Sequence, residues 1–180
     1  SRVPRELFLN DVLPYASLTE PRDRSRRFLR QLAAPLVAGC MNPGEAALRL
    51  NEKLFNQLDT HYSTKVPRPD ASPSESIRRR KATCIGLSVL LVAACRSVGI
   101  PARVAGTPAW TSGRGNGGTH EWVEVWDGRW RFLGADEARS EGLDHAWFNE
   151  EASLALKDKP MHAIYAVSFR RTGVQFPLVW

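Results

Sequence analysis

The most apolar stretch of the chain, residues 84–98, sets the strongest limit on the fold. It reads CIGLSVLLVAACRSV, so apolar or small residues fall on nearly every side of a helix drawn through it. A helix that is apolar all round is buried inside a domain. Thr83 is a favourable N-cap, and Gly99 followed by Pro101 ends the helix. We therefore predict a central buried helix, around which the rest of the chain packs.

Length and composition exclude several classes of protein. The chain has 180 residues, of which 43% are hydrophobic and 24% charged, as is typical of a globular domain rather than a disordered chain. No apolar run reaches the ~18 residues of a membrane-spanning helix, so we expect no membrane span. Three cysteines cannot all pair, which argues against a disulfide scaffold. The net charge of +6 comes from scattered arginines, so we expect no nucleic-acid partner.

The period of the apolar residues divides the chain into a helical and a strand-rich part. Before the central helix we predict two amphipathic helices, at residues 22–38 and about 43–58, and then a proline-containing extended loop at 63–76. After it, strands are predicted at 102–106, 120–126, 129–133 and 163–169, with a Gly-rich loop at 107–119. This order predicts an α+β fold, with the central helix packed on an antiparallel sheet.

We expect a helical N-terminal region at residues 1–62 and a core at 63–180, together forming one compact domain. The chain begins at Ser1 rather than Met and ends in a strand-like segment. We therefore also expect it to be part of a longer protein with further domains.

Cys84 is a candidate nucleophile because it stands at the predicted N-terminus of the buried helix. The unpaired N–H groups and the helix dipole there favour an anion, so the thiol pKa is expected to fall below its usual ~8.5. The alternative is a small core residue, since free cysteine is often buried. Cys95 lies eleven residues later on the same helix, too far for a disulfide, and is expected in the core.

His120 opens a predicted strand directly after the Gly-rich loop, which places an imidazole at the end of a sheet. A thiol nucleophile needs an imidazole within hydrogen-bond reach, oriented by a third group. Asp136 and Glu137, just past the hairpin, are candidate carboxylates for that role. A surface histidine is the alternative for His120. Neither Cys84 nor His120 has a second ligand at metal-site spacing, so no metal and no cofactor are expected.

Three motifs resemble the transglutaminase-like superfamily when they are taken together. Residues 83–88 (TCIGLS) and 95–103 (CRSVGIPAR) resemble the family's nucleophile helix and the "R-x-x-G-I-P-A-R" run at its end. Residues 119–126 (THEWVEVW) resemble the "H-x-W-x-E-V" histidine strand, and 128–130 (GRW) the "G-x-W" before the family's aspartate. The resemblance implies a papain-like, transglutaminase-like core with Cys84 as the nucleophile.

The third member of the implied Cys–His–acid triad departs from the family pattern. The family places Asp four residues after the Trp, and here that position is Gly134. Asp136 keeps the strand parity, whereas a bulge would bring Glu137 into its place, so both stay candidates. Asn51 and Tyr62 are candidate second donors to an oxyanion, beside the Cys84 N–H.

The resemblance implies acyl transfer at amide bonds of a protein or peptide, with hydrolysis, as in a cysteine protease or amidase, favoured over cross-linking. Trp110 and the Gly-rich loop are expected to border the substrate groove. Similarity to secreted bacterial domains favours an exported, extracytoplasmic protein. The alternative function, suggested by the irregular acid position, is a catalytically inactive domain that binds protein or glycan.

Overall fold

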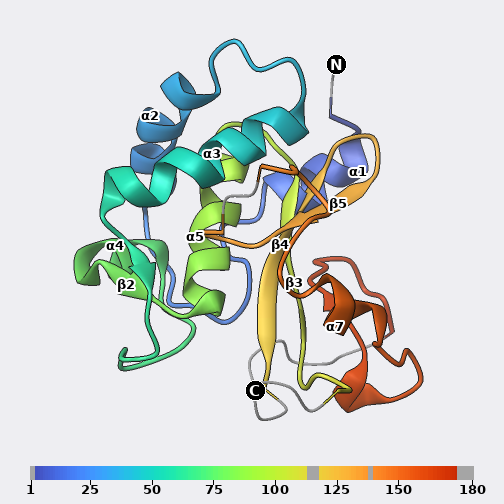
Figure 1. Ribbon diagram of the computed structural model, residues 1–180. Helices are drawn as coiled ribbons and strands as arrows, with labels where there is room; N and C mark the ends of the chain where they lie inside the picture. Colours follow the sequence, from blue (N-terminus) through green and yellow to red (C-terminus); the bar gives the residue numbers. More distant parts are fainter. Residues whose placement is uncertain (1–2, 113–117, 138–139, 174–180) are drawn as a thin grey trace.

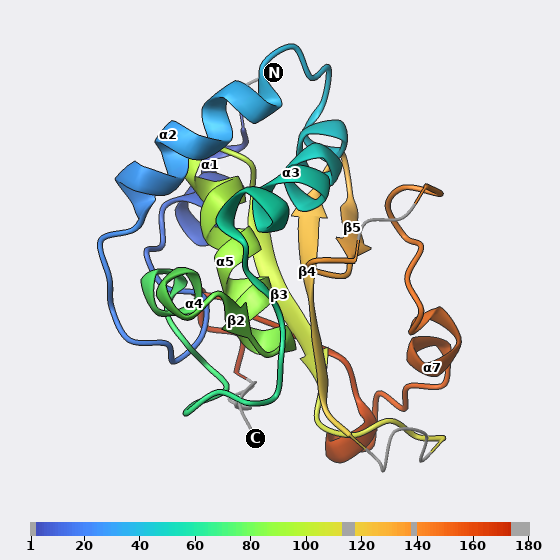
Figure 2. The same ribbon diagram turned by 60° about the vertical axis from the view of Figure 1, so that its left-hand side comes forward.

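The computed structural model describes residues 3–112, 118–137 and 140–173, and α5 (Cys84–Ser97) runs through its centre. Helix α2 (Arg26–Val37) packs along α5. Helix α3 (Pro43–Leu58) contacts both α5 and strand β4 of the sheet (Figure 1). Figure 2 shows these helices on one side of the strands and α7 (Asn149–Ser153) on the other. The predicted central helix is therefore confirmed, and Thr83 is its N-cap as expected.

The main sheet has four strands in the order β5-β4-β3-β6, and all neighbouring strands are antiparallel. Its strands are β3 (Ala102–Thr107), β4 (His120–Trp126), β5 (Trp130–Leu133) and β6 (Tyr165–Ala166). A tight turn joins β4 to β5, with a positive φ of 77° that Gly128 adopts at no steric cost. The predicted α+β fold with a helical N-terminal region is confirmed, although β6 is shorter than the expected strand at 163–169.

The two faces of β4 belong to different apolar clusters. Val123 and Val125 pack with α5 in the main core, whereas Trp122 packs with Trp110 and Phe148 in a smaller aromatic cluster. Successive side chains of a strand point to opposite faces. The first two residues of β4, which are a histidine and a glutamate, therefore serve different faces of the sheet.

The segment before α5 differs from its prediction. Residues 73–76 were expected in an extended loop, but they form the first turn of α4 (Pro73–Arg79). That prediction is wrong because proline is well tolerated at the first helical position and because Ser72 and Glu75 form a capping box there. A short parallel pair, β1 (His61–Tyr62) and β2 (Lys81–Ala82), flanks this segment.

Four short elements outside the core were not predicted. They are α1 (Arg5–Leu7), the π-helix η1 (Phe8–Val12), α7 and the 3-10 helix η2 (Pro160–His162). The expected domain division at 62/63 stays a prediction, and the main core contains residues from both sides of it, including Leu50 and Leu90. Part of the predicted loop at 107–119 lies outside the described residues.

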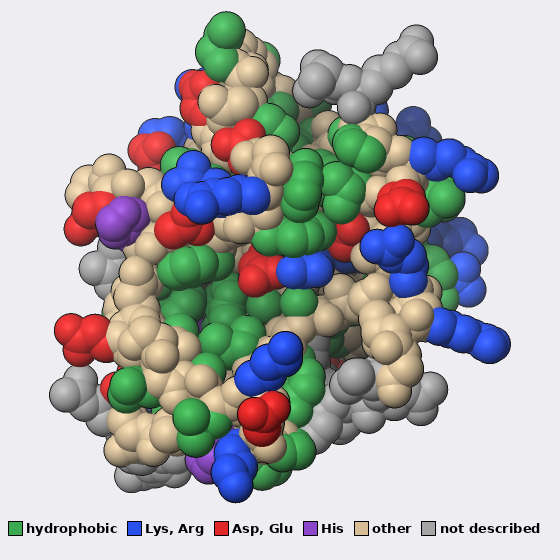
Figure 3. All heavy atoms as spheres, turned by 90° about the vertical axis from the view of Figure 1, so that its right-hand side faces the viewer, with side chains coloured by type: hydrophobic (Ala, Val, Ile, Leu, Met, Phe, Trp, Pro, Cys, Tyr) green, Lys and Arg blue, Asp and Glu red, His purple; other side chains and the backbone are tan. Residues whose placement is uncertain are grey.

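Figure 3 views the side of the molecule that faces right in Figure 1, where apolar side chains gather among charged ones. Large apolar side chains of the segment after β5 are exposed, among them Trp147, Leu154 and Met161. No helix in the described part of the chain has the length and apolar character needed to cross a membrane.

Candidate active site

A cavity of about 330 Å³ opens at the N-terminal end of α5. Cys84 reaches it from α5, His120 from the start of β4, and the carboxylates of Asp136 and Glu137 from the turn after β5. Trp110 lines it as well. The structure thus brings all the candidate catalytic residues of the sequence to one cavity, although their pairing there differs from the expected one.

The N-terminus of α5 is fixed by the hydroxyl of Thr83, which accepts a hydrogen bond from the Gly86 N–H at 3.3 Å. A side chain at Gly86 would meet the Ala82 Cβ at 2.8 Å, so glycine lets β2 lie close against the first turn. This local geometry places the Cys84 thiol at the edge of the cavity.

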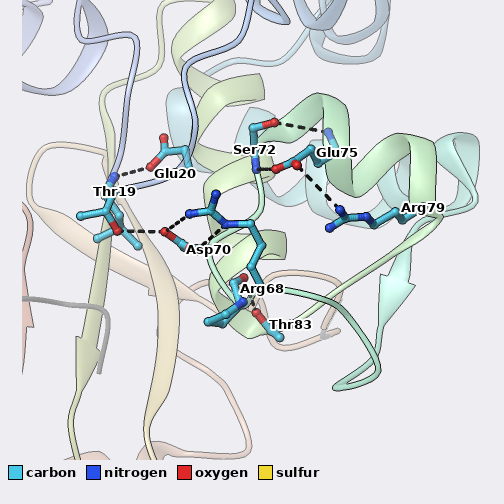
Figure 4. A network of polar contacts seen from close by, with 10 residues as sticks. Thr19, Glu20, Arg68, Asp70, Ser72, Glu75, Arg79 and Thr83 are labelled. Carbon is cyan, nitrogen blue, oxygen red and sulfur yellow. Dashed lines mark hydrogen bonds and ion pairs between the residues drawn. The ribbon is translucent and has the colours of Figure 1, made fainter.

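A polar network holds the preceding loop against the same end of α5 (Figure 4). The Thr83 hydroxyl donates to the Pro69 carbonyl at 2.8 Å. The nearly buried carboxylate of Asp70 accepts two hydrogen bonds from Arg68, both at 2.9 Å, and one from Thr19 at 3.0 Å. This loop is therefore an ordered wall beside the nucleophile position.

Glu121 is the closest polar partner of the thiol. The Cys84 Sγ donates to Glu121 Oε2 at 3.1 Å, and the Thr119 hydroxyl donates to Oε1 at 2.9 Å. Burial raises the pKa of the Glu121 carboxyl to about 7. Sequence reasoning missed this residue, although the alternation of β4 assigns it to the α5 side together with Val123 and Val125.

The predicted lowering of the Cys84 pKa is wrong for this structure. Burial, followed by the negative charge and hydrogen bond of Glu121, raises the pKa of the thiol to about 12. These two effects outweigh the favourable end of the helix dipole, because a charge acts more strongly at 3.1 Å in a buried site than partial charges do.

His120 lies in an aromatic enclosure on the other side of β4. The ring centroids of Trp147 and Phe148 are each 4.8 Å from that of the imidazole. The side chain is only 7% exposed, and its Nε2 has no hydrogen-bond partner within the described residues. Burial lowers the pKa of His120 to about 4, so the imidazole is neutral at neutral pH.

Asp136 pairs with a different histidine from the one predicted. The His61 Nδ1 lies 3.1 Å from Asp136 Oδ2. Asp136 has a positive φ of 64°, so the chain has left the strand at this residue and strand parity no longer sets the direction of its side chain. The sequence pattern around His61 predicts no such contact.

The carboxylate of Glu137 lies back against Gly134, just after β5. Its Oε1 accepts a hydrogen bond from the Trp147 Nε1 at 3.0 Å. A Cβ built on Gly134 would lie 2.7 Å from the Glu137 carboxyl carbon. The carboxylate therefore fills the space that a side chain at position 134 would take.

Asn51, a candidate oxyanion donor, braces this turn and is not among the residues that line the cavity. Its amide Nδ2 donates to the Gly134 carbonyl at 2.8 Å, and its Oδ1 accepts from the Asp136 N–H at 2.9 Å. Both ends of the buried amide are thus used to shape the turn. The other candidate donor, Tyr62, lines the cavity from β1.

Trp110 is mostly buried and stacks on Trp122, with ring centroids 6.2 Å apart. Trp147 lines the same cavity and is 51% exposed, which the sequence analysis did not anticipate. Within the ranges that the structure describes, no group of three His, Cys, Asp or Glu side chains is placed to hold a metal ion.

The family model for the transglutaminase-like superfamily matches residues 30–135, more than half of the chain. The chain belongs to the transglutaminase-like superfamily. A proposed cysteine protease from Cytophaga hutchinsonii has 19% sequence identity and a TM-score of 0.54, and the match covers 94% of this chain and 58% of that one. The present chain therefore spans little more than half the length of the Cytophaga protein.

The periplasmic domain of TgpA from Pseudomonas aeruginosa has 23% identity and a TM-score of 0.49, over 64% of this chain and 44% of that one. No curated protein sequence matches the chain. The family match confirms the resemblance to the transglutaminase-like superfamily that the sequence motifs indicate, and the Cytophaga structure confirms the fold.

Proposed function

We propose that this transglutaminase-like domain catalyses acyl transfer at amide bonds with Cys84 as the nucleophile. The observation that carries the proposal is the shared cavity. The thiol stands at the N-terminus of a buried helix. A neutral, nearly buried imidazole, whose Nε2 has no hydrogen-bond partner among the described residues, lines the same cavity. Nucleophilic catalysis by cysteine needs these two groups close together.

The proposed reaction has two steps. The Cys84 sulfur attacks the amide carbonyl carbon, the thiol proton passes through His120 to the leaving nitrogen, and the C–N bond breaks to leave a thioester. The first N–H groups of α5 have no partners within the helix, so they are suited to stabilise the oxyanion of the intermediate. Water then attacks the thioester and releases the acid, whereas an amine at this stage would form a new amide.

We assign Glu137 as the acid that orients His120. Its carboxylate fills the side-chain space of Gly134, which is the position of the family's aspartate by resemblance. Asp136 is the second candidate, and its contact with His61 argues for Glu137. Glu137 is itself held by Trp147, whose ring lies 4.8 Å from that of His120.

We favour hydrolysis of a protein or peptide over cross-linking, and an exported protein with further domains. The Cytophaga relative is a proposed cysteine protease, and proteases hydrolyse amide bonds, which supports this preference. The aromatic side chains of Trp147 and Tyr62 at the cavity suit a peptide substrate.

The test is turnover of a panel of peptide amides by the 180-residue chain. Cys84→Ala and His120→Ala should each abolish turnover while leaving the thermal unfolding curve of a folded protein. Cys40→Ala removes a thiol from the loop after α2 and serves as the matched control. Turnover that survives in Cys84→Ala would refute the proposal.

A catalytically inactive binding domain is the second candidate function. It is favoured by Gly134 in the acid position and by the raised pKa of the Cys84 thiol. It predicts that the wild type and Cys84→Ala bind the same peptides or glycans with equal affinity, and that neither forms a thioester detectable by mass spectrometry.

A further inference from the structure

Glu121 is a buried carboxylate that forms no ion pair with a described residue. Its side chain is 1% exposed, and none of the ion pairs between described residues includes it. Burying an ionised carboxylate is costly unless it is paired. The groups that face Glu121 must therefore account for the stability of its buried carboxyl group.

Those groups come from two neighbouring elements. Cys84 of α5 and Thr119, the residue before β4, each hydrogen-bond one carboxylate oxygen. On β3, a side chain at Gly106 would lie 3.0 Å from the Glu121 Cγ, so glycine leaves room for the glutamate. Only the thiol can exchange a proton with Glu121 across one of these hydrogen bonds at accessible pH.

Other titratable groups line the same cavity. They are Tyr62 on β1, the neighbouring His120 on the opposite face of β4, and Asp136 and Glu137 after β5. Within the described residues, the Glu121 carboxylate instead accepts its two hydrogen bonds from the thiol and from the Thr119 hydroxyl. The thiol and Glu121 therefore form a local pair.

We propose that Glu121 controls the protonation of Cys84, because the two side chains share a single proton once the pair has lost its first one. The nucleophilic thiolate then arises before attack by transfer within the pair: the Sγ–H bond breaks, an Oε2–H bond forms, and the total charge stays at −1. In the proposed reaction this proton later leaves Oε2 and passes through His120 to the leaving nitrogen. This inference rests on the proposed role of Cys84 as the nucleophile.

The electrostatics of the pair agree with shared protonation. Removing both protons would place two negative charges 3.1 Å apart in a buried site. Burial raises the pKa of Glu121 to about 7, and burial together with the negative charge of Glu121 raises the pKa of Cys84 to about 12. Two groups coupled this strongly titrate in two steps that belong to the pair.

Shared protonation has a specific signature in the pH profile of thiol reactivity. The thiolate population rises until about pH 7, where the pair loses its first proton. It then changes little over the following pH units, because the equilibrium between the two one-proton forms does not depend on pH. An isolated thiol would instead become about tenfold more ionised with each pH unit below its pKa.

The experiment is site-resolved alkylation of the 180-residue chain by iodoacetamide between pH 5 and 10, read by mass spectrometry. The wild type should show a plateau at Cys84 above pH 7, while Cys40 in the same digest shows a single rise. Glu121→Gln removes the charge but keeps the shape, so the plateau should disappear and the rate at pH 9 should increase by about tenfold or more.

Glu124→Gln is the matched control, since Glu124 lies on β4 but pairs with Arg103 on the opposite face. It should keep the wild-type profile. If Glu121→Gln folds poorly, Thr119→Val retains the carboxylate and removes one of its donors, so the lower step should move to higher pH.

A Cys84 profile that is a single rise in the wild type overturns the inference, as does an unchanged or slower rate in Glu121→Gln. Alkylation needs no substrate, so this result is independent of turnover. A wild type that alkylates as expected but cleaves no amide would refute the proposed function and leave the coupling of the pair intact.

Discussion

The carboxylate of Glu137 occupies the space that the side chain of residue 134 would take if it were not glycine. The two residues are three positions apart, and the turn between them folds the glutamate back onto the end of β5. The loss of the acid at the family's position is thus matched in space by an acid from a neighbouring position. This relationship supports the proposal that Glu137 is the acid that orients His120.

Gly134→Ala should lower activity by displacing Glu137. The new Cβ would lie 2.7 Å from the Glu137 carboxyl carbon, too close for the carboxylate to stay. Because a flexible side chain can move away, we expect a loss of about 1 kcal/mol or less in the free energy of unfolding. In a Glu137→Ala background the same change should have no further effect on kcat/KM, as a double-mutant cycle would show.

Glu137→Gln and Asp136→Asn should separate the two acid candidates. If Glu137 orients His120, Glu137→Gln should lower kcat by roughly 100-fold or more, because the amide cannot stabilise the imidazolium that forms. Asp136→Asn should change kcat/KM by less than about threefold, since its half-exposed pair with His61 is worth about 1 kcal/mol or less. The reverse order of effects would assign the role to Asp136.

Asn51→Ala should disorder the turn that carries both acids. It removes two buried hydrogen bonds to backbone groups, of 2.8 and 2.9 Å. The Asp136 N–H loses its side-chain acceptor, and the Gly134 carbonyl keeps only the longer bond from the Glu137 N–H at 3.3 Å. We expect a loss of about 2 to 4 kcal/mol in the free energy of unfolding, with a fall in kcat. Asn56→Ala on the exposed face of α3 is the control and should cost less than about 1 kcal/mol. Equal effects in urea unfolding would contradict the bracing role.

The sequence was sufficient to predict the scaffold, because its signals are local. The run at 84–98 and the alternation at 120–126 each determine an element without reference to the rest of the chain. The helix N-cap at Thr83 was predicted for the same reason. The resemblance to the superfamily then predicted how these elements pack together into one core.

The pairing inside the site could not be predicted from such signals. Whether Cys84 meets Glu121 or His120 depends on how α5 lies across β4, which is a tertiary property. The left-handed φ at Asp136 depends on the Asn51 amide, 85 residues away in the chain. Only the assignment of Glu121 to the α5 face was within reach, from the parity of the strand.

Glu121 and His120 should give the stability of the fold opposite dependences on pH. The folded state raises the pKa of Glu121 to about 7, so it binds more protons there than the unfolded chain between about pH 4.3 and 7. Stability from this group therefore increases as the pH falls. The folded state lowers the pKa of His120 to about 4, so between about pH 4 and 6.5 stability from this group decreases as the pH falls.

Single variants should separate the contributions of Glu121 and His120 to the pH dependence of stability, measured by urea unfolding at pH 5 and pH 7.5. Glu121→Gln removes the acid-stabilised group, so the variant should gain stability at pH 7.5 and lose it more steeply than the wild type towards pH 5. His120→Asn should have the opposite change of slope. Each difference should be on the order of 3 kcal/mol, since one pKa unit corresponds to about 1.4 kcal/mol. Parallel curves for the wild type and Glu121→Gln would show that the carboxyl titrates as an ordinary glutamate.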